Sequence, residues 1–158
     1  VDALRGIIDY VPGVIGSSAR YINEAIFEYD KDENGKDVKA GSWQIKSIDP
    51  ESEKKVTKVY LSMVEGKYLE ESDRNKIILG KEISGGYGAD LEYLSLGGIK
   101  TGDKGKVFFN NGVEKEYEVK GIFNLMNVQG DRMAFITEKE MESVSGQKNK
   151  ASEILVKI

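Results

Sequence analysis

The chain has 158 residues, of which 39% are hydrophobic and 32% charged, and its net charge is −4. This composition is typical of one globular domain with a well-charged surface, and it gives no basic footprint for nucleic acid. The chain contains no cysteine and no histidine, which excludes disulfide frameworks, zinc–cysteine sites, thiol nucleophiles and the Ser-His-Asp triad. No stretch approaches the roughly 18 apolar residues of a membrane span, and no signal peptide is recognisable.

The first part of the chain predicts a helix followed by two long strands. Apolar residues at helical spacing form one stripe that Pro12-Gly13 ends: Leu4, Ile7, Ile8 and Val11. Residues 14–29 alternate as a strand, but the alternation breaks near Asn23, which predicts a β-bulge there. A second strand is expected over 38–48, with Trp43 and Ile45 on one face.

The remaining elements are shorter and mixed. A turn or short helical piece is expected at 50–55, a strand at 76–79 and a short helix at 80–84 that glycines end. Asn111-Gly112 predicts a hairpin between strands 106–109 and 113–123. A strand at 133–136, a helix that opens on the capping box Thr137–Glu140, and a strand at 152–158 suggest a final β-α-β unit. We therefore expect a mixed α/β protein of the α+β class.

The segment Asp30–Asp37, "DKDENGKD", resembles the first half of an EF-hand loop, with Asp30, Asp32, Asn34 and Gly35 in register. The twelfth position is a glycine instead of the bidentate glutamate, and both flanks are predicted strands instead of helices. We interpret the segment as a solvated hairpin tip in which Asn34-Gly35 supply positive φ angles. A low-affinity calcium site formed by Asp30, Asp32 and Asn34 remains the alternative.

The glycine-rich segment 79–98 lacks both the P-loop pattern and the G-x-G-x-x-G pattern. It predicts an irregular loop whose glycines adopt positive φ angles. Tyr87 and Tyr93 make this loop a candidate contact surface, as are Asn34 and Gly35 at the hairpin tip. Closely spaced carboxylates such as Glu114, Glu116 and Glu118 indicate a solvated strand face, and no G-x-S-x-G elbow is present. We therefore expect no catalytic residues, no cofactor and no enzyme activity.

Six phrases of the sequence, in this order, resemble one family: "IIDYVPGV" (7–14), "VEGKYLEESDRNKIILGKEI" (64–83), "IKTGDKGKVFF" (99–109), "YEVKGIFN" (117–124), "MAFITEKEMESVSG" (133–146) and "ASEILVKI" (151–158). Together they resemble the MacB-like periplasmic core domain, the extracytoplasmic domain of ABC transporter permeases of the MacB, LolC/LolE and FtsX type. The segment 84–98 is longer and richer in glycine than the corresponding part of that family.

The resemblance implies a single extracytoplasmic domain, 1–158, with a porter-like part (1–50 with 121–158) and a smaller β-rich Sabre-like part (51–120). It also implies that both ends lead toward membrane helices, so the chain would be a piece of a longer membrane protein that lacks a first strand before Val1. The implied partners are the transmembrane helices of the permease, a cytoplasmic ATPase, a second permease copy and an extracytoplasmic accessory protein.

The function that we expect is therefore that of a non-catalytic extracytoplasmic domain, which couples ATP-driven membrane movement to substrate or partner handling outside the membrane. The alternative from another class is a free-standing calcium-dependent binding or adhesion module. A carboxylate-based hydrolase ranks third, because it rests only on the abundance of Asp and Glu.

Overall fold

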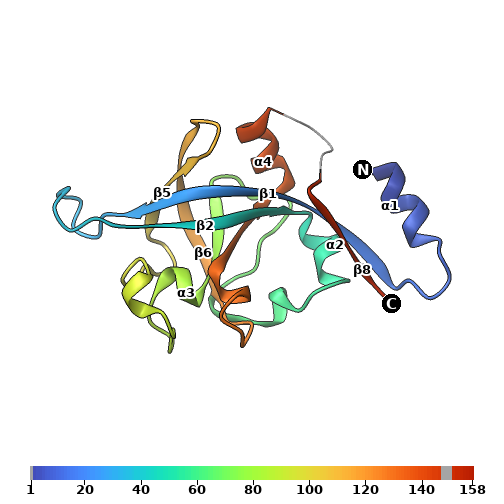
Figure 1. The fold of residues 1–158 in the computed structure, drawn as a ribbon, viewed down its shortest axis with the longest axis horizontal. Coiled ribbons are helices and arrows are strands. Elements are labelled where there is room, and N and C mark those ends of the chain that lie inside the picture. The colour runs from blue at the N-terminus through green and yellow to red at the C-terminus, as the bar shows by residue number, and fades with distance from the viewer. Residues whose placement is uncertain (1, 147–150) are drawn as a thin grey trace.

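The computed structural model describes residues 2–146 and 151–158. It is a mixed α+β fold, as expected, with the following helices and strands in chain order (Figure 1): α1 (Asp2–Asp9), β1 (Gly16–Tyr29), β2 (Lys39–Ile48), α2 (Pro50–Lys54), β3 (Met63–Gly66), β4 (Lys76–Gly80), α3 (Lys81–Ser84), β5 (Lys104–Phe109), β6 (Glu114–Phe123), β7 (Met133–Thr137), α4 (Glu138–Ser145) and β8 (Glu153–Lys157). Three single-turn 3-10 helices complete the order: η1 (Val59–Leu61), η2 (Glu92–Leu94) and η3 (Gly130–Arg132).

Six strands pair in a closed ring. β1 is antiparallel to both β2 and β5, β2 is parallel to β7, and β7 is antiparallel to β4. β4 is parallel to β6, and β6 is antiparallel to β5, which returns the ring to β1. The inward side chains of these strands form the main core, which includes Phe27, Trp43, Ile45, Leu79 and Tyr117. Closure leaves β3 and β8 as the additions outside the ring, on β6 and β1 respectively.

The long strand β1 changes partner along its length. Gly16–Arg20 pairs with β8, and Tyr21–Tyr29 pairs with β2 without a register shift. The expected bulge at Asn23 is therefore wrong. The alternation breaks because both faces of the first part of β1 are covered: the Ser17 hydroxyl donates to Asp9 of α1 at 2.7 Å, and the Ser18 hydroxyl donates to Glu53 of α2 at 2.7 Å.

A buried charge network ties α2 and β8 to the ring. Arg20 of β1 forms an ion pair with the buried Glu53, and its guanidinium also lies 3.4 Å from Glu153 of β8. Lys46 of β2 contacts the same Glu153 oxygen at 3.2 Å. Two cations and two carboxylates from four elements therefore neutralise one another, and Glu153, with a side chain that is 33% exposed, is the member that reaches solvent.

The helix α1 is held by its polar side. Arg5 donates to the backbone oxygen of Ser17 at 2.9 Å and to the hydroxyl of Ser52 at 2.7 Å, while Asp9 accepts from Ser17. The apolar stripe faces outward, since Leu4 is 51% and Ile7 67% exposed. The predicted helix is confirmed, but its apolar side does not pack on the core.

The predicted hairpin and the last helix are also confirmed. β5 and β6 are antiparallel on either side of Gly112, whose φ is +88°. The Thr137 hydroxyl accepts from the Glu140 backbone at 3.2 Å and begins α4, which ends at Gly146 in the left-handed region. β7 and β8 do not pair with each other within the described residues: β7 lies between β2 and β4, whereas β8 lies on β1.

Both chain ends lie at the end of the molecule opposite the turn between β1 and β2 (Figure 1). Strands from both expected parts, porter-like and Sabre-like, contribute to the one ring. The division at residues 50 and 121 stays a prediction.

Candidate functional site

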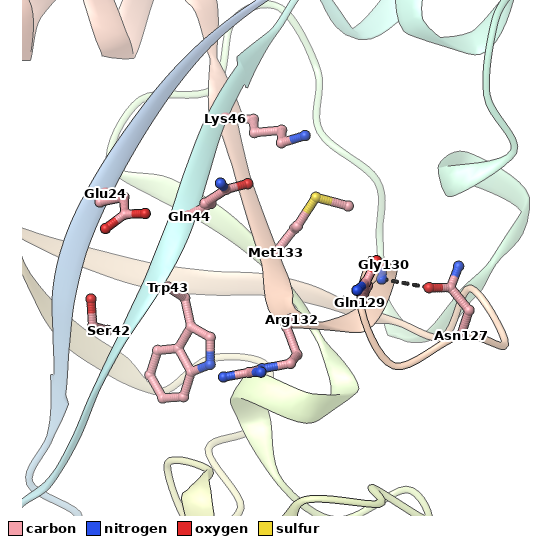
Figure 2. Close-up of a pocket in the computed structure, with 10 residues that line it drawn as sticks. All are labelled: Glu24, Ser42, Trp43, Gln44, Lys46, Asn127, Gln129, Gly130, Arg132 and Met133. Atoms are coloured by element: carbon pink, nitrogen blue, oxygen red, sulfur yellow. Dashed lines mark hydrogen bonds between the residues drawn. The ribbon is translucent and has the colours of Figure 1, made fainter.

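A polar groove with a volume of about 630 Å³ lies beside β2, next to the start of β7 (Figure 2). Its floor comes from β1, β2 and the start of β7, and its wall comes from the loop that connects β6 to β7. The residues that line it are Glu24, Ser42, Trp43, Gln44, Lys46, Asn127, Gln129, Gly130, Arg132 and Met133. Neither the strand pattern nor the family resemblance pointed to this surface.

The alternation of side chains along β2 determines which of its residues form the floor of the groove. Trp43 and Ile45 point into the core, so Ser42, Gln44 and Lys46 point outward. The pairing of β2 with β7 begins at Gln44, opposite Met133. The preceding part of β2 therefore has a strand neighbour only on its β1 side among the described residues, and the groove occupies the space where β7 has not yet begun.

The wall is a short loop closed by its own hydrogen bonds. The Asn127 side chain accepts from the Gly130 backbone at 2.7 Å (dashed in Figure 2). The buried Asp131 accepts from the Leu125 backbone at 2.6 Å. A β-carbon at Gly80 would lie 2.1 Å from the backbone oxygen of Asp131, so a glycine lets β4 approach the loop this closely. These contacts fix the loop from which Arg132 extends.

Asp131 is an unusual support for this loop because it is fully buried. One carboxylate oxygen binds Leu125, and the other, Oδ2, has no hydrogen-bond partner in the described part of the chain. Burial raises the pKa of the Asp131 carboxyl above its ordinary value, and the Leu125 hydrogen bond and Lys81 oppose this shift. The nearby Glu82 adds to the rise in the pKa.

Several polar groups of the groove have no partner in the protein. Within residues 2–146 and 151–158, the indole N–H of Trp43 and the side chains of Ser42, Gln44, Gln129 and Arg132 make no hydrogen bond or ion pair. Glu24 is the one carboxylate among the residues that line the groove, so the paired acids that glycoside hydrolysis needs do not face each other here. The groove is therefore equipped to bind a polar ligand, with hydrogen-bond donors in excess.

The hairpin-tip residues are brought together, but their oxygens serve the turn. Asp30 accepts from the backbone of Asn34 at 3.3 Å and of Gly35 at 2.8 Å, and Asn34 accepts from the backbone of Lys36 at 2.9 Å. Gly35 adopts a positive φ as expected, and Glu33, not Asn34, is the other residue that does so. In the described part of the chain, no group of three or more acidic side chains is placed to hold a metal ion.

The glycine-rich loop has the positive φ angles expected of it, at Gly85, Gly86, Gly88 and in addition at Tyr87. The buried Glu82 holds it by accepting from the backbone of Asp90 at 2.6 Å and of Leu91 at 2.9 Å. Tyr87 is 39% and Tyr93 81% exposed. Both tyrosines are accessible, and their role in an interaction stays a prediction.

No protein-family model and no curated protein matches this sequence. Solved structures do match. The extracellular domain of the noncanonic ABC-type transporter YknZ from Gram-positive bacteria superposes with a TM-score of 0.64 at 15% identity, over 96% of this chain and 69% of that one. The periplasmic region of MacB from Actinobacillus actinomycetemcomitans gives a TM-score of 0.61 at 11% identity, over 99% of this chain and 64% of that one.

The chain therefore has the fold of the extracytoplasmic domains of MacB-type ABC transporters, as the sequence phrases predicted. It spans less than two thirds of the MacB chain and slightly more than two thirds of the YknZ chain. None of the helices in the described residues has the length and the apolar content to cross a membrane.

Proposed function

We propose that this chain is a non-catalytic extracytoplasmic domain of an ABC transporter permease. It couples ATP-driven movement of the membrane helices to the handling of a substrate or partner outside the membrane. The observation that carries this proposal is the agreement in fold, over nearly the whole chain, with two extracytoplasmic domains of such transporters.

The arrangement of the chain supports the same proposal. Both ends lie at one end of the molecule (Figure 1), so a domain inserted between two membrane helices would leave the membrane and return to it on the same side. β1 leads from this end to the hairpin tip as one continuous strand of 14 residues. Movement imposed at the ends would therefore reach the tip through a single strand.

The partners in this function are the transmembrane helices, a cytoplasmic ATPase, a second permease copy and an extracytoplasmic accessory protein. The porter-like part is 1–50 with 121–158, and the Sabre-like part is 51–120. The surfaces available for contact are the polar groove, the hairpin tip with Asn34 and Gly35, and the loop with Tyr87 and Tyr93.

The location is tested with a single cysteine, because the chain contains none of its own. Lys36 is exposed at the hairpin tip, so Lys36→Cys is introduced into the parent protein in cells. A membrane-impermeant maleimide should label this cysteine in intact cells, with the unsubstituted protein as the control. Labelling that requires lysis, or a parent gene with no membrane spans on either side of this segment, would contradict the proposal.

The coupling is tested separately with spin labels at the same cysteine. In purified parent transporter, the distance between the labels of two copies should change when ATP is added. A distance that stays the same with ATP, with ADP and without nucleotide would refute coupling through this domain and leave its location untouched.

A further inference from the structure

We propose that the polar groove between β2 and the β6–β7 loop binds a carboxylate carried by an extended peptide. This inference goes beyond the proposed function and does not depend on it. It rests on the side chains that line the groove, and on the shape of the β2 edge beside them.

The first donor is the indole N–H of Trp43. Trp43 is buried, with an exposed fraction of 6% for the whole residue. It packs edge-on against Phe27 at 5.5 Å between ring centroids, and it covers Gly41, where a β-carbon would lie 2.3 Å from the ring. These contacts fix the ring, and its nitrogen points toward the Arg132 side chain (Figure 2). A fixed donor without a protein acceptor favours a ligand that brings one.

The second donor is the guanidinium of Arg132. It is exposed, it makes no ion pair within the described residues, and it extends to the same part of the groove as the Trp43 nitrogen (Figure 2). A guanidinium offers a planar fork of N–H groups that matches the two oxygens of a carboxylate. Because the loop that carries Arg132 is closed by Asn127 and Asp131, the fork starts from a fixed position.

The rest of the groove favours a neutral ligand body. Gln44 and Gln129 offer amide groups that can donate and accept, and Ser42 offers a hydroxyl. Lys46 already contacts Glu153 at 3.2 Å. Glu24 lies on the β1 side of the floor, where it would repel a second negative charge. A ligand with one carboxylate and an otherwise uncharged, amide-containing chain therefore fits this set of side chains.

The shape of the β2 edge indicates that this chain is extended. Before Gln44, β2 lacks a described strand neighbour on the groove side. A peptide can add as a strand at such an edge, with its main chain paired to the sheet. The ligand would then take the position that β7 leaves empty, and its carboxylate would reach Trp43 and Arg132.

The single tryptophan of the chain gives a direct test. The indole N–H has one ¹⁵N–¹H resonance, which is followed while acetylated Ala-Thr-Val-Thr-Ala with a free carboxyl end is added to the chain. The same peptide with an amidated end is the matched ligand control. A third peptide, amidated and with a central aspartate, distinguishes a side-chain carboxylate from a terminal one.

The indole resonance should shift in a saturable manner with the free-acid peptide or with the aspartate peptide, and not with the neutral one. Arg132→Gln should weaken this binding about tenfold or more, as expected for a lost charge-assisted contact, whereas Arg74→Gln, at an exposed arginine outside the groove, should not. No shift with either acidic peptide, equal shifts with the neutral peptide, or unchanged binding in Arg132→Gln would overturn the inference. None of these results bears on the membrane location of the domain.

Discussion

The carboxylate of Glu53 accepts from the Nε of Arg20 at 3.2 Å, and the two side chains are 0% and 7% exposed. The same carboxylate accepts from Ser18 at 2.7 Å and from Thr57 at 3.0 Å. Among the described residues, this carboxylate is therefore bound by Arg20, Ser18 and Thr57. A buried charge of this kind depends on its counter-ion, because water cannot replace it.

Glu53→Gln should lower the free energy of unfolding by about 3–5 kcal/mol, since it leaves Arg20 buried without its main counter-ion. Urea denaturation measures the change. Glu51→Gln removes an exposed ion pair with Lys54 on the same helix and should cost less than about 1 kcal/mol. Equal losses of unfolding free energy in the two variants would show that the buried ion pair contributes no more to stability than the exposed one.

Two glycine substitutions should have opposite effects on stability, because Gly80 lies against the backbone of the β6–β7 loop and Gly6 does not. Gly80→Ala places a β-carbon 2.1 Å from the Asp131 backbone oxygen and should lower stability by about 1–3 kcal/mol. A β-carbon at Gly6 in α1 would meet nothing within 4 Å beyond its chain neighbours and its own helix backbone, so Gly6→Ala should raise stability by about 0.5–1 kcal/mol. Melting temperatures that move in the same direction would contradict this packing.

The buried Asp131 predicts a pH dependence of stability. Its pKa is raised in the folded state, so its contribution is fully present below the unfolded-state pKa and is lost as the pH rises through the folded-state pKa. Asp131→Asn does not titrate. The unfolding free energy of the natural chain minus that of the variant should therefore fall as the pH rises above the ordinary aspartate pKa of about 4. A difference that is constant or rises over this range would contradict a raised pKa.

The hairpin tip predicts no response to calcium. Asp30 already accepts from the backbone of Asn34 and Gly35, and Asp30→Asn keeps an oxygen for this turn. Thermal unfolding of the natural chain and of Asp30→Asn should each be the same with calcium chloride and with a chelator. If calcium raises the melting temperature of the natural chain alone, the tip is a metal site and the alternative function is restored.

Because the polar side of α1 contacts the protein and its apolar side faces outward, the loss of a polar side chain from α1 should lower stability more than the loss of an apolar one. Arg5→Ala removes the hydrogen bonds to Ser17 and Ser52 and should cost about 1–2 kcal/mol. Ile7→Ser changes a side chain that is 67% exposed and should change stability by less than about 0.5 kcal/mol. Hydrogen exchange in residues 2–9 reports the docking of the helix. A larger loss in Ile7→Ser would show that the apolar side is covered.

Local signals in the sequence predicted most elements correctly. Asn111-Gly112 predicted a hairpin and Thr137 predicted a helix start, because turn and cap geometry depend on neighbouring residues alone. Periodicity did not predict the closed ring, because the parallel pairs β2–β7 and β4–β6 join distant segments. Periodicity also predicted a bulge at Asn23 wrongly. The alternation is lost because other elements cover both faces of the first part of β1, and the backbone pairing of β1 is not interrupted.

The groove escaped prediction for a similar reason. The alternation of β2 places Ser42 and Gln44 outward, which a reader of the sequence can deduce. Arg132, however, reaches them only because β2 lies beside β7, and that pairing spans almost ninety residues of sequence. The sequence also predicted only one of the roles of Glu140, its place at the start of the last helix. The Glu140 carboxylate accepts a hydrogen bond from the Tyr117 hydroxyl at 3.1 Å, a contact that no local pattern indicates.

The pairing of Gly16 with Lys157 places the two ends of the described sheet side by side on antiparallel strands. A force that pulls these two ends apart would break the hydrogen bonds between β8 and β1 one at a time, and would therefore meet little mechanical resistance. A force that moves both ends together would instead load β1 along its axis, over about 46 Å at 3.3 Å per residue. The domain would therefore yield to a force that separates its two ends, and it would resist a force that moves both ends along the axis of β1.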